Sequence, residues 1–226
     1  MNLCLFDLDG TLIETDSDHA FGEFLVSIGW ADSENFRRRN DAFLVDYQAG
    51  RLDLAAYLEF ATSAWRARPL DEALAVRADF MRQVMAPALR EPAHALVRRH
   101  QRDGDRVAIV TATNEFVTRP IADAFGVDQL IAIELACDEN GRYNGSARGV
   151  PSFREGKIVR VTQWLAELGL QRDAFERITV YSDSMNDLPL LEWATHPVAT
   201  NPGLELARLA RARGWPILNL FEQQQA

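Results

Sequence analysis

The sequence has very little lysine and cysteine. Of its 24 basic side chains, 23 are arginine and only Lys157 is lysine. Cys4 and Cys137 are the only cysteines, too few for a disulfide framework, and both lie in apolar or strand-like runs, so we expect buried, reduced thiols. The sequence therefore predicts a protein of a reducing compartment.

Long apolar runs and basic tracts are also missing. No stretch approaches the roughly 18 apolar residues that cross a bilayer, and no basic leader precedes Asp7, so we expect a cytoplasmic protein without a membrane partner. The longest basic tract is 37–39, and the formal net charge of -9 repels phosphate backbones. Nucleic acid is excluded as an expected partner.

What the sequence does contain is an alternation of strand-like and helical patterns. Short apolar runs cover 3–6, 106–111, 177–182, 197–200 and 216–220, and helical patterns cover 91–102, 115–125, 153–168, 188–194 and 204–213. Such alternation predicts an α/β fold, a Rossmann-like parallel sheet with helices on both faces. At 226 residues, one domain with a sizeable insert fits best.

Two segments interrupt the alternation. The segment 16–86 has several helical stretches and no strand-like run, which predicts a small α-helical cap inserted after the first strand. We place the core domain at 1–14 and 88–226 and the cap at 15–87. The segment 130–145 carries an Asn-Gly turn signal between two strand-like pieces, which predicts a hairpin.

Polar side chains follow the first two predicted strands. Asp7 and Asp9 stand one residue apart after the first strand, in Asp-Leu-Asp-Gly-Thr, where Gly10 permits a tight turn. Thr111 closes the next strand, and its hydroxyl, with nearby backbone N–H groups, can hold phosphate oxygens. Ligands bind at this edge of open α/β sheets.

Lys157 is informative because the rest of the chain uses arginine. A compact ammonium can sit between a carboxylate and a phosphate oxygen where a planar guanidinium is too large. The alternative, equal in weight on this residue alone, is that one lysine was retained by chance.

Asp183 and Asp187 follow a later strand, at the start of a helix. Helix capping would explain one of them. Four carboxylates at the ends of two strands are harder to explain, since like charges ~4 Å apart repel by ~4 kcal/mol at an effective dielectric of 20. A divalent cation relieves this repulsion, and an all-oxygen ligand set favours Mg²⁺.

These four motifs, in this order, resemble those of the haloacid dehalogenase superfamily, subfamily IB, the phosphoserine phosphatase-like branch. The resemblance implies a Mg²⁺-dependent phosphatase acting on a small phosphorylated metabolite. Asp7 would be the nucleophile that becomes an aspartyl phosphate, Asp9 the general acid and base, and Thr111 and Lys157 would stabilise the phosphoryl oxygens. The metal would be held by Asp7, Asp9 through its backbone carbonyl, Asp183 and Asp187.

Substrate contacts are expected from both the cap and the motifs, namely from Asp16, Glu59, Thr11, Ala112, Thr113 and Asn186. In the resemblance, Asp16 stands where phosphoserine phosphatases place a glutamate for the substrate ammonium. Glu59 stands where they place an arginine for the substrate carboxylate. We therefore expect an amino-alcohol phosphate, histidinol phosphate or phosphoserine, with histidinol phosphate favoured because Glu59 would repel a carboxylate. Alternatively, Glu59 lies on a solvated helix face and Arg51 or another arginine is the clamp.

Other interpretations stay open at this point. A phosphomutase or phosphotransferase would use the same aspartyl phosphate, and a non-catalytic metabolite-binding relative is a further alternative, disfavoured by the presence of Asp9. His19 could contact substrate or cap the first helix of the insert, while His94 and His100 are expected at the surface.

Overall fold

The computed structural model describes residues 1–221, and within them a six-stranded sheet forms the centre of the molecule. Its strands are β1 (Asn2–Phe6), β2 (Arg106–Asn114), β3 (Leu130–Ile133), β6 (Arg177–Ser182), β7 (His196–Thr200) and β8 (Ile217–Leu218). Their order is β3-β2-β1-β6-β7-β8, and every neighbouring pair is parallel. The Rossmann-like parallel sheet predicted from the sequence is confirmed.

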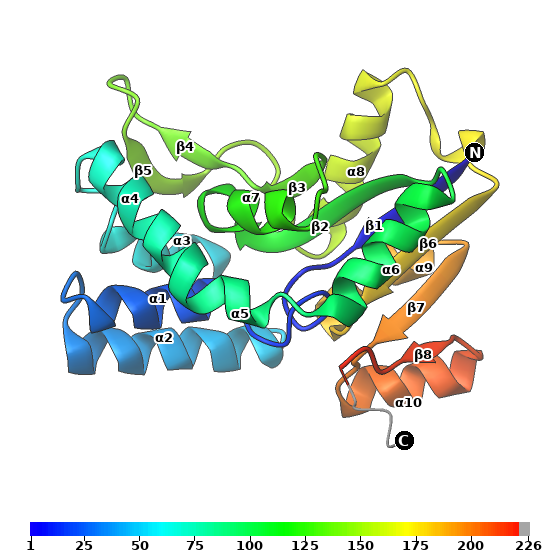
Figure 1. Ribbon diagram of the computed structural model, residues 1–226, viewed down its shortest axis with the longest axis horizontal. Helices are drawn as coiled ribbons and strands as arrows, with labels where there is room; N and C mark the ends of the chain where they lie inside the picture. The colour runs from blue at the N-terminus through cyan, green and yellow to red at the C-terminus, as the bar shows by residue number, and fades with distance from the viewer. Residues whose placement is uncertain (222–226) are drawn as a thin grey trace.

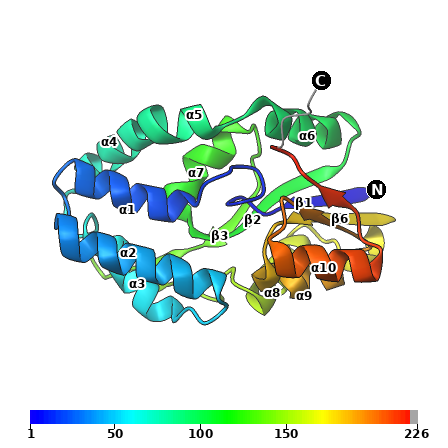
Figure 2. The ribbon, with the colours of Figure 1, turned by 90° about the horizontal axis from the view of Figure 1, so that it is seen from below.

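Helices cover both faces of this sheet (Figure 2). One face carries α6 (Glu91–Arg102) and α7 (Glu115–Ala124), and the other carries α8 (Glu155–Glu167), α9 (Leu188–Trp193) and α10 (Leu204–Arg213). Side chains of β1 alternate between the two cores, because Cys4 and Phe6 pack with α6 and α7 whereas Leu3 and Leu5 pack with α8, α9 and α10. Because β1 is buried on both faces, its side chains enter both cores, and this explains why its apolar run is continuous.

The predicted helical insert lies between β1 and β2. It consists of α1 (Ser17–Ser27), α2 (Ser33–Gln48), α3 (Leu54–Ser63) and α4 (Leu70–Phe80), followed by a π-helical turn (Met81–Met85) and α5 (Ala86–Ala88) that lead back to the sheet. These helices stack beside the sheet rather than on it (Figure 1). We propose to keep the boundaries 15–87 for this cap.

The predicted hairpin forms from β4 (Leu135–Cys137) and β5 (Tyr143–Ala147), which pair antiparallel outside the main sheet. The first part of the segment in which we expected it, β3, belongs to the main sheet instead. The hairpin packs against α3 of the cap (Figure 1). The region above the sheet edge is therefore built from one segment that precedes β2 in the sequence and one that follows it.

Two expectations about side-chain burial are wrong. Cys137 is exposed, because β4 lies in the hairpin and not in the sheet, although Cys4 is buried as expected. His100 is buried, because it is on the sheet-facing side of α6, where Asp105 Oδ2 lies 2.7 Å from its Nδ1 and Tyr181 Oη lies 2.8 Å from its Nε2. Among residues 1–221, none of the helices combines the length and the apolar character that a membrane span requires.

Candidate active site

The predicted catalytic residues meet at the C-terminal edge of the sheet. Asp7 directly follows β1, Thr111 lies near the end of β2, and Asp183 directly follows β6. Parallel strands end at the same edge, so motifs more than a hundred residues apart in sequence converge there. Gly10 makes the turn after β1 with φ +74°, and a Cβ at this position would lie 2.3 Å from Asp183 Oδ2. Only glycine lets the two loops approach so closely.

Lys157 is fully buried at the first turn of α8 and contacts two carboxylates. Its Nζ lies 2.9 Å from Asp7 Oδ1, and 2.6 and 2.7 Å from the two oxygens of Asp187. Burial alone would lower the pKa of Lys157, but the charges of Asp187 and Asp7 outweigh it and raise the pKa. The lysine therefore stays charged beside Asp7. Asp187, its second carboxylate partner, is held in turn by Ser182, whose Oγ donates to Asp187 Oδ2 at 2.8 Å.

Asp9 is oriented by two donors from different elements. Its Oδ1 accepts the Ser17 N–H at 2.7 Å, and its Oδ2 accepts the Thr113 hydroxyl at 2.9 Å. Burial, together with the charge of Asp16, raises the pKa of Asp9 to about 7. A carboxyl group with such a pKa can both donate and accept a proton near neutrality, as a general acid and base must.

Thr11 and Thr111, predicted to contact phosphate or substrate, have partners within the protein. The Thr11 hydroxyl accepts the Asp183 N–H and donates to Asp183 Oδ1, both at 3.1 Å, so it holds the aspartate loop. Thr111 is buried and its hydroxyl accepts the Thr113 N–H at 3.1 Å. Asn201, which the sequence did not indicate, donates to the carbonyls of Gly10 (2.9 Å) and Thr11 (3.2 Å) and so ties this turn to the end of β7.

The donor set at this edge fits a magnesium ion. Burial first, and then the negative charges of Asp7 and Asp187, raise the pKa of Asp183. Burial and Asp187 likewise raise the pKa of Asp7 to about 7, against the opposing charge of Lys157. Accumulated carboxylate charge of this kind is relieved by a hard divalent cation with oxygen ligands. Asp7, Asp183 and the Asp9 carbonyl stay the proposed ligands, with Asp187 beside them, and both Asp7 and Asp187 also contact Lys157.

Above the sheet edge lies a cavity, which we call the cap cavity, between the catalytic carboxylates and the helical cap. It is lined by Asp7, Asp9, Asp16, His19, Asn40, Phe43, Leu44, Tyr47, Leu52, Leu54, Tyr57, Thr111, Ala112, Thr113 and Phe153. Within the chain that the structure describes, these lining residues include neither lysine nor arginine. The cap residues that line it are therefore aromatic or aliphatic apart from Asp16, His19 and Asn40.

Only some of the predicted substrate contacts line the cap cavity. Asp16, Ala112 and Thr113 line the cap cavity as expected. Asn186 does not line it, but its Nδ2 donates to the Tyr47 carbonyl at 2.9 Å and links the aspartate loop to the end of α2. Beside this link, Arg154 donates to the Gly50 carbonyl, so the cap is bonded to the core at adjacent points.

Glu59 does not line the cap cavity, so its predicted contact with the substrate is corrected. It lies in α3 on the side that faces the hairpin, where both its oxygens are paired with Arg66 beside Gly145. The helical register, which the sequence did not define, turns it away from Asp7. Arg51, the alternative clamp, is exposed and paired with Asp46 at 2.8 Å, and it does not line the cavity either.

A buried cap residue, Asp18, was missed by the sequence analysis. Its Oδ2 accepts the Tyr57 hydroxyl at 2.7 Å, and both its oxygens lie 3.3 Å from the Nδ2 donor of Asn114, at the start of α7. Asp18 thus joins α1, α3 and the core behind the cavity wall. The only sequence signal was the second aspartate in Asp16-Ser17-Asp18, which resembles an ordinary helix start.

Comparison with known proteins places this geometry in a family. The model of the haloacid dehalogenase-like hydrolases matches residues 4–192, a span that holds all four motifs. The chain belongs to the haloacid dehalogenase-like hydrolases. Within this family it is a phosphatase, as the motifs predicted, and it has the fold of the phosphoserine phosphatases.

Individual relatives agree with that assignment. A histidinol-phosphatase of Neisseria meningitidis serogroup C is 41% identical over 218 residues, which cover 96% of this chain and 98% of the relative. A crystal structure of a protein of unknown function from Bordetella pertussis Tohama I is 48% identical, with a TM-score of 0.92 and coverage of 97% and 99%. A substrate-bound phosphoserine phosphatase shares the fold, with a TM-score of 0.67, 16% identity and coverage of 96% and 91%.

Proposed function

We propose that this phosphatase hydrolyses histidinol phosphate, with Mg²⁺ as cofactor and an aspartyl phosphate on Asp7 as intermediate. The observation that carries the choice of substrate is the composition of the cap cavity, which has Asp16 but neither lysine nor arginine among its lining residues. A carboxylate-bearing substrate such as phosphoserine would enter this wall without a cationic partner, which is costly for a buried charge. A substrate with an ammonium group and an apolar ring matches it.

The proposed roles follow from the contacts at the sheet edge. Asp7 attacks phosphorus in line, while Lys157 keeps its orientation and neutralises charge on the phosphoryl oxygens. Asp9, held by Ser17 and Thr113, gives a proton to the leaving alkoxide and then takes one from the water that opens the aspartyl phosphate. Mg²⁺, bound through Asp7, Asp183 and the Asp9 carbonyl, would supply Lewis-acid stabilisation of the phosphoryl oxygens.

The histidinol-phosphatase that is 41% identical to this chain supports the same substrate, because the alignment covers nearly the whole of both chains. Conversely, the substrate-bound phosphoserine phosphatase structure is only 16% identical to this chain, so its likeness supports the fold alone.

The proposal is tested by release of inorganic phosphate from histidinol phosphate. We expect steady turnover that stops on addition of EDTA, returns with excess Mg²⁺ and is absent in Asp7→Asn. Failure of the purified protein to release phosphate from histidinol phosphate, while it hydrolyses other phosphate esters, would overturn the substrate assignment but not the phosphatase.

A further inference from the structure

His19 is the cap-cavity residue whose role the proposed reaction leaves open. It lies in the first turn of α1, where its backbone N–H donates to Asp16 Oδ1 at 2.8 Å, and its side chain lines the cavity. The side chain is 24% exposed, so it is accessible from the cavity yet held on most sides. His19 and Asp16 therefore present neighbouring polar atoms to the same space.

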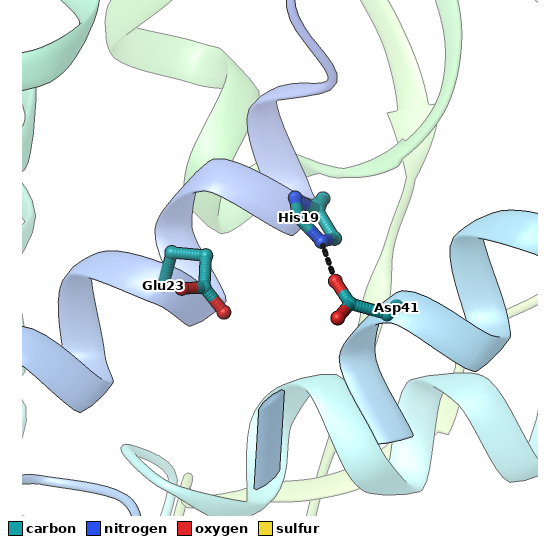
Figure 3. Close-up of side chains that lie close together, drawn as sticks. All are labelled: His19, Glu23 and Asp41. Atoms are coloured by element: carbon teal, nitrogen blue, oxygen red, sulfur yellow. Dashed lines mark hydrogen bonds and ion pairs between the residues drawn. The ribbon is translucent and has the colours of Figure 1, made fainter. Parts of the chain in front are cut away.

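Asp41 defines the hydrogen-bonding state of the His19 ring. It reaches across from α2, and its Oδ1 lies 2.8 Å from His19 Nε2 (Figure 3). An ionised carboxylate can only accept, so Nε2 carries the hydrogen of this bond, and in the neutral ring the lone pair is then on Nδ1. No hydrogen bond within residues 1–221 engages Nδ1.

The helix pair keeps the ring in this position. Asn40, next to Asp41 on α2, donates from Nδ2 to the His19 carbonyl at 2.9 Å and packs so closely on Gly22 that a Cβ there would meet it at 2.8 Å. Adjacent residues of α2 thus hold the backbone and the ring of His19. Such support is what a preorganised binding residue needs.

Glu23 completes a group of three potential metal ligands with His19 and Asp41, whose ligand atoms lie within 4.8 Å of one another, and Figure 3 shows a bond only between His19 and Asp41. Its Oε2 accepts from Arg37 Nε at 2.8 Å, and Asp41 is already bonded to the ring. Glu23 is therefore paired with Arg37 and Asp41 with the ring, so we assign the histidine to the cavity and not to a metal.

We propose that His19, held by Asp41 as the tautomer with a free Nδ1, accepts a hydrogen bond from the ring N–H of the substrate, and that Asp41 is a positioning residue for it. This inference rests on the proposed function. Asp16 then accepts from the substrate ammonium, and the aromatic wall formed by Phe43, Tyr47, Tyr57 and Phe153 packs on the ring. A cavity whose Asp16 and His19 both accept hydrogen bonds selects a substrate rich in donors.

The test compares two substrates and a matched set of variants. p-Nitrophenyl phosphate has an aromatic ring but no N–H donor, whereas histidinol phosphate has one in its imidazole. For His19→Phe, which keeps a ring without nitrogen, we expect the KM for histidinol phosphate to rise roughly tenfold or more, as loss of one hydrogen bond allows. The KM for p-nitrophenyl phosphate should rise far less, and a urea unfolding midpoint close to that of wild type would show that the variant is folded.

Other variants separate recognition from structure. His19→Asn, whose amide oxygen can occupy the place of Nδ1, should recover part of the lost affinity. Asp41→Ala should raise the KM for histidinol phosphate with kcat unchanged, while Glu23→Gln, altered in the same cluster but not bonded to the ring, should leave both constants at wild-type values.

The outcomes distinguish this inference from the proposed function. If wild-type protein does not hydrolyse histidinol phosphate, the proposed function fails and the inference fails with it. If wild-type protein does so and His19→Phe has the same KM, or if His19→Phe impairs both substrates equally, the inference alone is overturned. An unchanged KM in Asp41→Ala would remove the positioning role.

Discussion

The two walls of the substrate site are built from different kinds of contact. At the sheet edge, Asp7 and Asp187 are buried and both bond to the buried Lys157, which keeps its charge between them. Across the cavity, the cap presents aromatic rings with Asp16 and a partly exposed His19. From this difference we expect the first wall to perform phosphoryl transfer on many esters and the second to decide which ester reaches it.

The largest predicted effect comes from the nucleophile. Asp7→Asn removes the attacking carboxylate while keeping size, so we expect kcat to fall by at least about 10⁴-fold on every phosphate ester. Phosphate release measured on histidinol phosphate and p-nitrophenyl phosphate checks this. Substantial activity on either substrate would contradict the proposal that Asp7 is the nucleophile for both esters.

Lys157→Arg tests whether the buried ammonium can be replaced by a larger cation. The side chain is fully buried between Asp7 and Asp187, so a guanidinium must displace its neighbours. We expect about a hundredfold loss of kcat and about 1–3 kcal/mol of destabilisation, measured by urea unfolding. Arg160→Lys, on the same helix and paired with Glu134, is the control and should change neither. Equal behaviour of the two variants would contradict the predicted role of Lys157.

Asp16→Asn changes the cap wall and leaves the sheet edge in place. Loss of the carboxylate should raise the KM for histidinol phosphate roughly ten- to a hundredfold, the range for a hydrogen bond to a charged group. The KM for p-nitrophenyl phosphate, which has no ammonium, should not rise. Glu59→Gln, paired with Arg66 outside the cavity, should leave the KM for histidinol phosphate unchanged. If Glu59→Gln raised the KM more than Asp16→Asn, the proposal that Asp16 and not Glu59 contacts the substrate would be contradicted.

Asp18→Asn has the smallest expected effect, and it acts on stability. Burial raises the pKa of Asp18 to about 6, so the folded state favours the protonated form. Folding stability therefore falls as pH rises from about 4 to 6, because the unfolded state ionises more readily, and it stays lower above that range. Urea unfolding should show Asp18→Asn to be about 1–2 kcal/mol more stable than wild type at pH 8, with the difference vanishing near pH 4. A less stable variant at pH 8 would contradict this sign.

The convergence of the motif residues could be predicted from the sequence because these residues follow strand ends. Asp7, Thr111 and Asp183 each stand where an apolar run stops, and parallel strands bring such positions to one edge. Lys157 was recognisable because all the remaining Lys or Arg positions are arginine. Strand-end position and residue type together were enough to predict this edge.

Cap residues could not be predicted equally well, because their roles depend on helix register and on contacts between helices. Glu59 and Asp16 are both acidic, yet only Asp16 lines the cavity. His100 was expected at the surface because its partners, Asp105 and Tyr181, come together only in the folded sheet. The bond between His19 and Asp41 joins two helices in the same way, and no spacing in the sequence indicates it.

The most direct test of the division between the two walls is a competition between histidinol phosphate and L-phosphoserine in one reaction, with each product measured. A cap wall with Asp16 and no cationic lining residue predicts a kcat/KM for histidinol phosphate at least about a hundredfold higher, since binding a carboxylate there costs several kcal/mol. Equal consumption of the two esters, or a preference for L-phosphoserine, would contradict the account.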